Sequence, residues 1–167
     1  SKQTLVIGCS NHGAVSSSYS STPSVFSNAC GSTGGLVGWL TSDCVIEGCY
    51  NSGSVTTNWP GAGGLVGQVK QGTVANSYSV GTVTSTYTGE WPVGIGSMFG
   101  YVFSTTKSPV WDHNAYLSAG LDAAGVDDYT KGHPDVLQQP EAKTAEELKS
   151  ADYLKSLQDY FTQELTC

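Results

Sequence analysis

The stretch Gly34–Gly38 reads Gly-Gly-Leu-Val-Gly, and it returns unchanged at Gly63–Gly67. A weaker third copy, Gly-Ser-Met-Phe-Gly, stands at Gly96–Gly100. Self-similarity at a spacing of tens of residues is typical of folds in which one short unit is stacked on copies of itself. The sequence therefore predicts a repeat architecture, in which equivalent residues of successive copies become neighbours in space.

A second repeated element lies between these copies. Ile46–Val55 reads Ile-Glu-Gly-Cys-Tyr-Asn-Ser-Gly-Ser-Val and matches Val74–Val83, which reads Val-Ala-Asn-Ser-Tyr-Ser-Val-Gly-Thr-Val. An earlier copy is Val6–Val15, and residues 112–117 form a degenerate fourth copy. The extra length of the first unit falls in residues 16–33. Insertions of this kind leave a stacked repeat as loops without breaking the stack.

Each unit carries only a few apolar residues, so one unit alone cannot offset the entropy lost on ordering it. Units stacked as parallel strands, about 4.8 Å apart, would share one interior. The many glycines suit corners where the chain turns sharply. We therefore expect a mostly β protein, a parallel β-solenoid over residues 1–117, with Leu36, Leu65 and Met98 in successive layers.

These elements resemble the GLUG repeat. The resemblance rests on Gly-Gly-Leu-Val-Gly alternating with Gly-Cys-Tyr-Asn-Ser-Gly-Ser-Val, and it covers roughly residues 1–117. The last coil departs from the pattern at Trp111 and Asp112. GLUG repeats occur in large secreted or wall-attached bacterial proteins, including adhesin-like proteins and the non-catalytic regions of IgA-cleaving metallopeptidases. The resemblance implies a right-handed β-solenoid, an extracellular or cell-surface location, and a role as a spacer or adhesive stalk.

The composition changes after Leu117. Residues 118–143 are acidic and contain several glycines and prolines, which predicts an irregular connection. Thr144 and Glu147 then have the spacing of a capping box, in which each side chain satisfies the backbone of the other residue. We expect residues 144–167 to form a helical cap, which would cover strand edges that otherwise invite aggregation.

The charge of the chain argues against two classes of partner. The formal net charge is −7, and none of the seven basic residues is an arginine. Nucleic-acid binding needs clustered cations, and an acidic surface is not attracted to anionic lipid. No stretch reaches the roughly 20 apolar residues of a membrane-spanning helix. We expect no nucleic-acid binding and no membrane insertion, and instead a protein or glycan on a host or neighbouring cell, or end-to-end self-association.

The sequence gives little support for catalysis. The three histidines lack the His-Glu-x-x-His pattern of metallopeptidases. Enzymes built on parallel β-helices need stacked carboxylates beside Lys or Arg. Glu47 instead aligns with Ala75 and Ile7, so no carboxylate is expected next to it. We predict a non-catalytic module without catalytic residues. The alternatives are a binding module or the accessory region of a larger secreted peptidase.

Aromatic residues are the candidate binding site. Trp59 and Trp91 each precede a proline in turn excursions one coil apart, and the second excursion also carries Tyr87. Stacked on one side, they would form an exposed ridge for a sugar or a protein partner. The alternative is that each tryptophan covers the coil corner beneath it.

Cysteines and aspartates supply the remaining candidate sites. Cys9 and Cys49 hold equivalent positions, and the spacing between rungs lies within the Cα range of a disulfide. Cys30 and Cys44 flank the first Gly-Gly-Leu-Val-Gly strand and are the other candidate pair. Small buried thiols are the alternative to both. We expect no cofactor except for a candidate Ca²⁺ site, because oxygen ligands gather in the acidic loop. Its candidate ligands are Asp122, Asp127 and Asp128.

Overall fold

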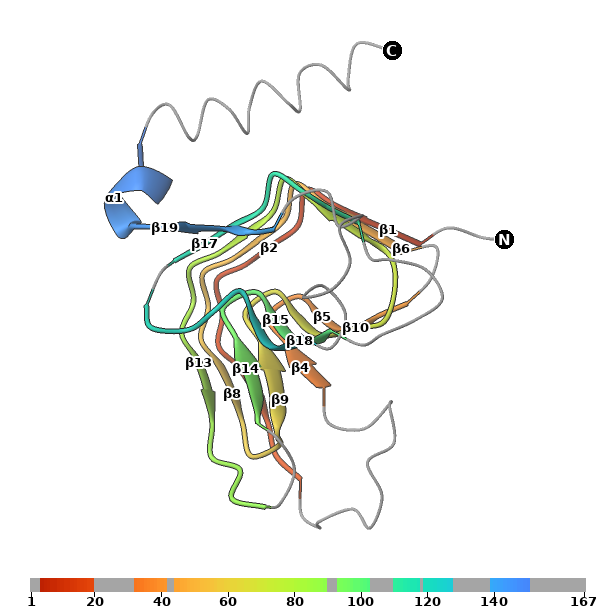
Figure 1. Cartoon of the computed structure of the whole chain (residues 1–167), viewed down its shortest axis with the longest axis vertical. Coiled ribbons are helices and arrows are strands. Elements are labelled where there is room, and N and C mark those ends of the chain that lie inside the picture. Colours follow the sequence, from red (N-terminus) through yellow and green to blue (C-terminus); the bar gives the residue numbers. More distant parts are fainter. Residues whose placement is uncertain are drawn as a thin grey trace.

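The chain folds into stacked parallel coils. The computed structural model describes residues 4–19, 32–41, 44–89, 93–102, 110–117, 119–127 and 139–150. Within these ranges every strand pairing is parallel, and each sheet takes one strand from each successive coil. In Figure 1 the strands of successive coils follow one common path from red through green. The predicted β-solenoid is thereby confirmed.

The described strands form five sheets, which make up the walls of the stack. The first contains β1 (Thr4–Ile7), β6 (Cys44–Glu47), β11 (Thr73–Ala75) and β16 (Val110–Asp112). The second contains β2 (Ser10–Asn11), β7 (Tyr50–Asn51), β12 (Tyr78–Ser79), β17 (Ala115–Leu117) and β19 (Glu141–Lys143). The third contains β3 (Val15–Ser17), β8 (Val55–Thr57) and β13 (Val83–Ser85).

The last two sheets carry the Gly-Gly-Leu-Val-Gly repeats. One contains β4 (Ser32–Gly34), β9 (Gly61–Gly63) and β14 (Gly94–Gly96). The other contains β5 (Val37–Leu40), β10 (Val66–Val69), β15 (Phe99–Val102) and β18 (Ala124–Asp127). Each repeat therefore ends one strand at its first residue, turns at its second and third residues and begins the next strand at its fourth residue.

The core is formed by equivalent residues of successive coils. Leu36 N–H donates to Leu65 O at 3.0 Å, and Leu65 N–H donates to Met98 O at 2.9 Å, so these residues lie in successive layers as predicted. The main cluster is fully or almost fully buried and consists of Leu40, Ile46, Cys49, Leu65, Val66, Val69, Val74, Met98, Phe99 and Val102. Stacking gives each short coil the apolar neighbours that it lacks alone.

The segment 118–143 is not merely the predicted irregular connection. Its strand β18 pairs with β15, and β19 pairs with β17, so the stack continues beyond the expected boundary at residue 117. The prediction was wrong for Ala124–Asp127 and Glu141–Lys143 because it relied on composition. Strands β15 and β17 present backbone groups that the next segment satisfies by pairing, despite its glycines, prolines and acids.

The helical cap begins as the sequence predicted. Glu147 N–H donates to Thr144 Oγ1 at 3.2 Å, and Thr144 N–H donates to Glu147 Oε2 at 2.7 Å, which completes the capping box. Helix α1 spans Ala145–Leu148. The remainder of the predicted cap, from residue 151 onward, lies outside the described residues. None of the helical segments that the structure describes has the length and apolar character needed to cross a bilayer.

Candidate binding groove

Two tyrosines form the floor of an open groove. Parallel pairing of β7 and β12 sets Tyr50 beside Tyr78. Their rings are stacked, with centroids 4.9 Å apart and planes inclined by only 1°. The spacing follows from the sheet itself, because strands in a sheet lie about 4.8 Å apart and equivalent side chains leave in the same direction. The repeat thus joins the tyrosines of two successive coils into one aromatic surface.

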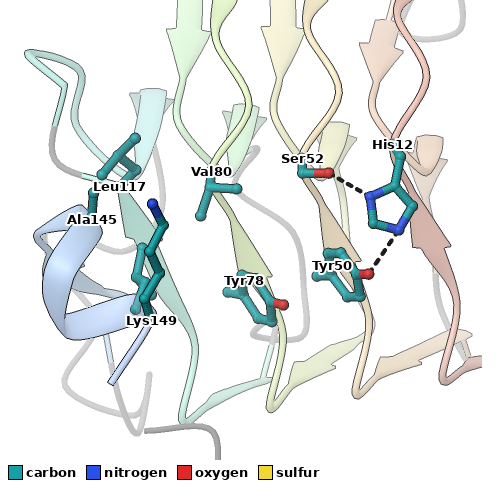
Figure 2. A pocket seen from close by; sticks show the side chains of 9 residues that line it. His12, Tyr50, Ser52, Tyr78, Val80, Leu117, Ala145 and Lys149 are labelled. Carbon is teal, nitrogen blue, oxygen red and sulfur yellow. Dashed lines mark hydrogen bonds between the residues drawn. The ribbon is translucent and has the colours of Figure 1, made fainter. Parts of the chain in front are cut away.

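His12 is held at the first-coil end of the groove. Its Nε2 lies 2.7 Å from Tyr50 Oη, and its Nδ1 lies 2.8 Å from Ser52 Oγ. Figure 2 shows both bonds, with His12 on the coil that precedes Tyr50 and Ser52. The imidazole also meets the Tyr50 ring edge-on, at a centroid distance of 5.1 Å. These contacts fix the orientation of the Tyr50 hydroxyl at the groove surface.

Helix α1 forms the opposite wall of the groove. Leu148 is buried, whereas Ala145 and Lys149 are exposed on the helix and at its end. The groove encloses about 540 Å³ and is lined by His12, Tyr50, Ser52, Tyr78, Val80, Leu117, Ala145, Leu148 and Lys149. Figure 2 shows the tyrosines between His12 and the helix. The capping box therefore stabilises the first turn of the helix that forms this wall.

The groove offers hydrogen bonds and apolar contact. Burial, and then the neighbouring Tyr50, raise the pKa of Tyr78 above its usual value, so its hydroxyl stays protonated to a higher pH than that of an ordinary tyrosine. No carboxylate is among the lining residues, and Lys149 is their one permanently charged side chain. Aromatic rings with hydroxyl groups and a few polar side chains are suited to binding a ring or a side chain of a partner.

A column of corner side chains lies inside the stack, away from the groove. The N–H of Cys9 donates to Cys49 Sγ at 3.4 Å, and the N–H of Cys49 donates to Ser77 Oγ at 3.1 Å. The N–H of Ser77 then donates to Asn114 Oδ1 at 3.1 Å. Each corner thus binds the next coil through a side chain. These thiol, hydroxyl and amide groups accept the hydrogen bonds that join successive coils.

In the first candidate pair, Cys49 is a small buried thiol, as the alternative predicted, whereas Cys9 is exposed. Cys9 and Cys49 are adjacent, as their equivalence predicted, but both are free and no disulfide joins them. Burial raises the pKa of the Cys49 thiol. Cys44 Sγ lies 3.7 Å from Thr41 Oγ1. Cys30, its candidate disulfide partner, lies outside the described residues.

The predicted aromatic ridge does not hold for Trp59. This side chain is only 4% exposed, and it packs between Tyr19 and Tyr87 at centroid distances of 5.1 and 6.2 Å. Trp59 therefore covers the coil corner, which was the alternative prediction, because its apolar ring gains more from burial than from exposure. Trp91 lies outside the described residues. Tyr87 is half-buried and contributes to the cover over Trp59.

The structure describes the surroundings of only one of the three candidate calcium ligands. Asp122 is exposed, Asp127 ends strand β18, and Asp128 lies outside the described residues. Among the described residues, no three His, Cys, Asp or Glu side chains form a group that could hold a metal ion. A calcium site involving Asp128 stays a prediction.

Sequence reasoning missed the groove. It compared the histidines only with the His-Glu-x-x-His pattern and predicted no role for His12. The signal that was available is the alignment of the repeats, which sets Tyr50 over Tyr78. The position of α1 beside these tyrosines was not predictable from the alignment, because the helix lies outside the repeats.

Comparison with known proteins identifies the repeat. The family model described as the GLUG motif matches the chain twice, at residues 29–56 and 60–84. These matches run from β4 into β8 and from β9 into β13, that is, over most of two successive coils. No curated protein and no solved structure matches the chain.

Proposed function

Because the chain is a GLUG-repeat solenoid, we propose that it is a non-catalytic structural and adhesive module of a bacterial surface or secreted protein. The groove makes the adhesive contact with a protein or glycan on a host or neighbouring cell. The observation that carries this proposal is the stacked pair Tyr50 and Tyr78 on the floor of an open groove. Outward-facing aromatic surfaces rimmed by polar groups are typical of contact sites.

The structural part of the proposal rests on how the stack uses its polar side chains. Asn51, Ser77 and Asn114 are buried, and each side chain hydrogen-bonds to backbone or side-chain groups within the stack. Such ladders fix the register between coils and stiffen the stack. A stiff stack is suited to hold a contact surface away from its point of attachment.

The charge of the chain supports the choice of partner. With a formal net charge of −7 and no arginine, the chain is unsuited to phosphate backbones and anionic lipid surfaces. The groove itself is lined by hydroxyl, imidazole and apolar groups, with no carboxylate. Uncharged or weakly acidic sugars and protein side chains are the chemistry that such a surface accepts.

The adhesive role is tested by removing the aromatic floor. Fluorescently labelled chain is applied to glycan arrays and to intact epithelial and bacterial cells, alongside the double variant Tyr50→Ala/Tyr78→Ala. We expect the variant to lose binding at least about tenfold, since stacked aromatic contacts contribute roughly 1 kcal/mol each beyond area burial. Trp39→Ala is the matched control, because Trp39 is also an exposed aromatic residue (38%) but belongs to strand β5.

Two results would contradict the adhesive role. One is wild-type chain that binds no array or cell at micromolar concentration; the other is equal loss of binding in the groove variant and in Trp39→Ala. Circular dichroism must first show that both variants keep the β-rich spectrum. The cellular location is tested separately, by labelling intact cells of the source bacterium with antibody against the chain. Labelling that requires lysis would contradict a surface location.

A further inference from the structure

Among the described strands, those of the first coil lie at one end of the stack. Strands β1, β2 and β3 each lie at the edge of their sheet. Leu5 and Ile7 on β1 are 55% and 51% exposed. Cys9 is exposed, although its equivalent in the next coil, Cys49, is completely buried. The first coil thus carries apolar side chains and a thiol, as an internal coil does, but these side chains are exposed.

The backbone of this coil has hydrogen-bonding groups directed outward. Tyr50 and Ser52 donate their N–H groups to Cys9 O and Asn11 O of the preceding coil, at 3.0 and 2.9 Å. Tyr78 and Val80 do the same toward Cys49 O and Asn51 O. By this regular alternation of parallel strands, the equivalent N–H groups of Ser10 and His12 face the open side of the stack.

A ladder of asparagine side chains is also open at this end. Asn51 Oδ1 accepts two hydrogen bonds, from Gly53 N–H at 3.2 Å and from Asn11 Nδ2 at 2.8 Å. Asn11 Oδ1 accepts the equivalent bond within its own coil, from Gly13 N–H at 3.1 Å. A carbonyl oxygen has two lone pairs, so Asn11 Oδ1 can also accept a hydrogen bond from the side-chain amide of an asparagine on a further coil.

The contacts of the described stack do not explain why residue 13 is a glycine. A Cβ on Gly53 would collide with the carbonyl of Gly13, and one on Gly81 would collide with the carbonyl of Gly53. A Cβ on Gly13 would meet only Asn11 Oδ1, at an ordinary 3.6 Å. Glycine is needed at this position only where the carbonyl of a preceding coil approaches it. Gly13 is therefore the residue that a further coil in front of the first would require.

The corner column is closed at the opposite end of the stack. Pairing of Ala115 with Glu141 sets Pro140 over Asn114 in that column. In the other coils, the corner N–H donates to the corner side chain of the next coil. Proline has neither an N–H nor a polar side chain, so it cannot donate this bond to a further coil. Helix α1 follows directly after β19. A second copy of this chain therefore does not offer, through this end, the corner donor that the first coil would accept.

We propose that the open edge of β1, β2 and β3 receives one further repeat coil of the same polypeptide, laid parallel in front of the first. Its asparagine donates to Asn11 Oδ1, its corner N–H donates to Cys9 Sγ, and its backbone carbonyls accept from Ser10 and His12. This inference rests on the fold and not on the adhesive role of the groove, so either can fail without the other.

The experiment adds such a coil. Thr4 pairs with Cys44, and Gly72 holds the same register position because Thr73 pairs with Val45. A copy of residues 44–71 joined directly to Thr4, in place of residues 1–3, therefore supplies one coil in register. We expect the extended chain to melt at a higher temperature and amide exchange at Ser10 and His12 to slow roughly tenfold or more.

The variant Gly13→Ala makes the test specific. We expect it to leave the melting temperature of the original chain nearly unchanged and to lower that of the extended chain clearly, because the added carbonyl then meets the new methyl group. Equal effects of Gly13→Ala in both chains would overturn the proposal, as would unchanged exchange at Ser10 and His12 on extension. It would also be overturned if the original chain self-associates in sedimentation experiments and this association alone protects the two amides.

Discussion

Asn11 Nδ2 donates a hydrogen bond to Asn51 Oδ1 at 2.8 Å, although 40 residues separate the two side chains. Each side chain also bonds to the glycine two positions further on in its own coil. One residue type therefore closes the local turn and fixes the register between coils at once. Asn51 is completely buried, which makes these hydrogen bonds stronger than they would be in water.

The ladder stops at Ser79, and extending it should stabilise the protein. Ser79 holds the position of Asn51 in the next coil, and its buried hydroxyl has no hydrogen-bond partner. We expect Ser79→Asn to accept from Asn51 Nδ2 and to raise the free energy of unfolding by about 1 kcal/mol, measured by thermal or urea denaturation. Ser79→Ala is the control and should be nearly neutral. A Ser79→Asn protein less stable than Ser79→Ala would contradict this extension.

A second prediction concerns the left-handed corner. Gly8, Gly48, Asn76 and His113 hold one corner position in successive coils, with φ of 61°, 58°, 47° and 48°. Only glycine adopts this region without strain, and Asn76 Nδ2 is in addition buried without a partner. Asn76→Gly should therefore stabilise the protein by about 1 kcal/mol in urea denaturation. Gly48→Ala should change stability in the opposite direction, and stabilisation by Gly48→Ala would refute this account of the corner.

The Gly-Gly-Leu-Val-Gly repeat should be intolerant of a methyl group at its second glycine. A Cβ on Gly64 would collide with the carbonyl of Ser97 and the hydroxyl of Ser79. Because the carbonyl belongs to the backbone, it cannot move aside cheaply. Gly64→Ala should cost about 3 kcal/mol, at the upper end for overpacking. Gly13→Ala, where the new methyl group would make only an ordinary contact with Asn11 Oδ1, is the control, and equal melting temperatures for the two variants would be inconsistent with close approach at Gly64.

The two neighbouring thiols should differ in reactivity. Cys9 is exposed, whereas Cys49 is buried and its pKa is raised by that burial. The thiolate is the reacting form. At pH 8, iodoacetamide should modify Cys9 within minutes and Cys49 only after unfolding, as read by peptide mass spectrometry. Recovery of a Cys9–Cys49 disulfide-linked peptide would contradict the free thiols, and simultaneous modification would contradict the burial of Cys49.

The capping box should make the wall of the groove sensitive to acid. Hydrogen bonds from the backbone and side chain of Thr144 lower the pKa of Glu147 below its usual value. The stabilisation that the ionised Glu147 side chain gives to the folded state is therefore complete above that usual pKa. It is lost as the pH falls through the lowered pKa of Glu147. An NMR titration of the Thr144 amide should give a midpoint below that of Glu in an unfolded peptide. Thr144→Ala removes the hydroxyl donor and keeps the backbone N–H donor, so it should move the Glu147 midpoint part of the way toward the usual value. An unchanged midpoint would rule out the Thr144 hydroxyl as a cause.

Much of the fold followed from the repeats alone. Two copies of Gly-Gly-Leu-Val-Gly were enough to predict that Leu36 and Leu65 lie in neighbouring layers. The capping box at Thr144 was equally readable, because it depends on side chains only three residues apart. The strands at 124–127 and 141–143 were missed, since pairing with β15 and β17 overrides a composition that favours loops.

The sequence by itself determined which residues are equivalent, and hence which ones a parallel stack makes neighbours. Only the tertiary structure decided which of those neighbours face the core and which face outward. Trp59 is covered by Tyr19 and Tyr87, whereas Tyr50 and Tyr78 line a groove beside helix α1. The physical reason is that spacing along the chain fixes a position in the coil, while burial depends on segments outside the repeat that pack over it.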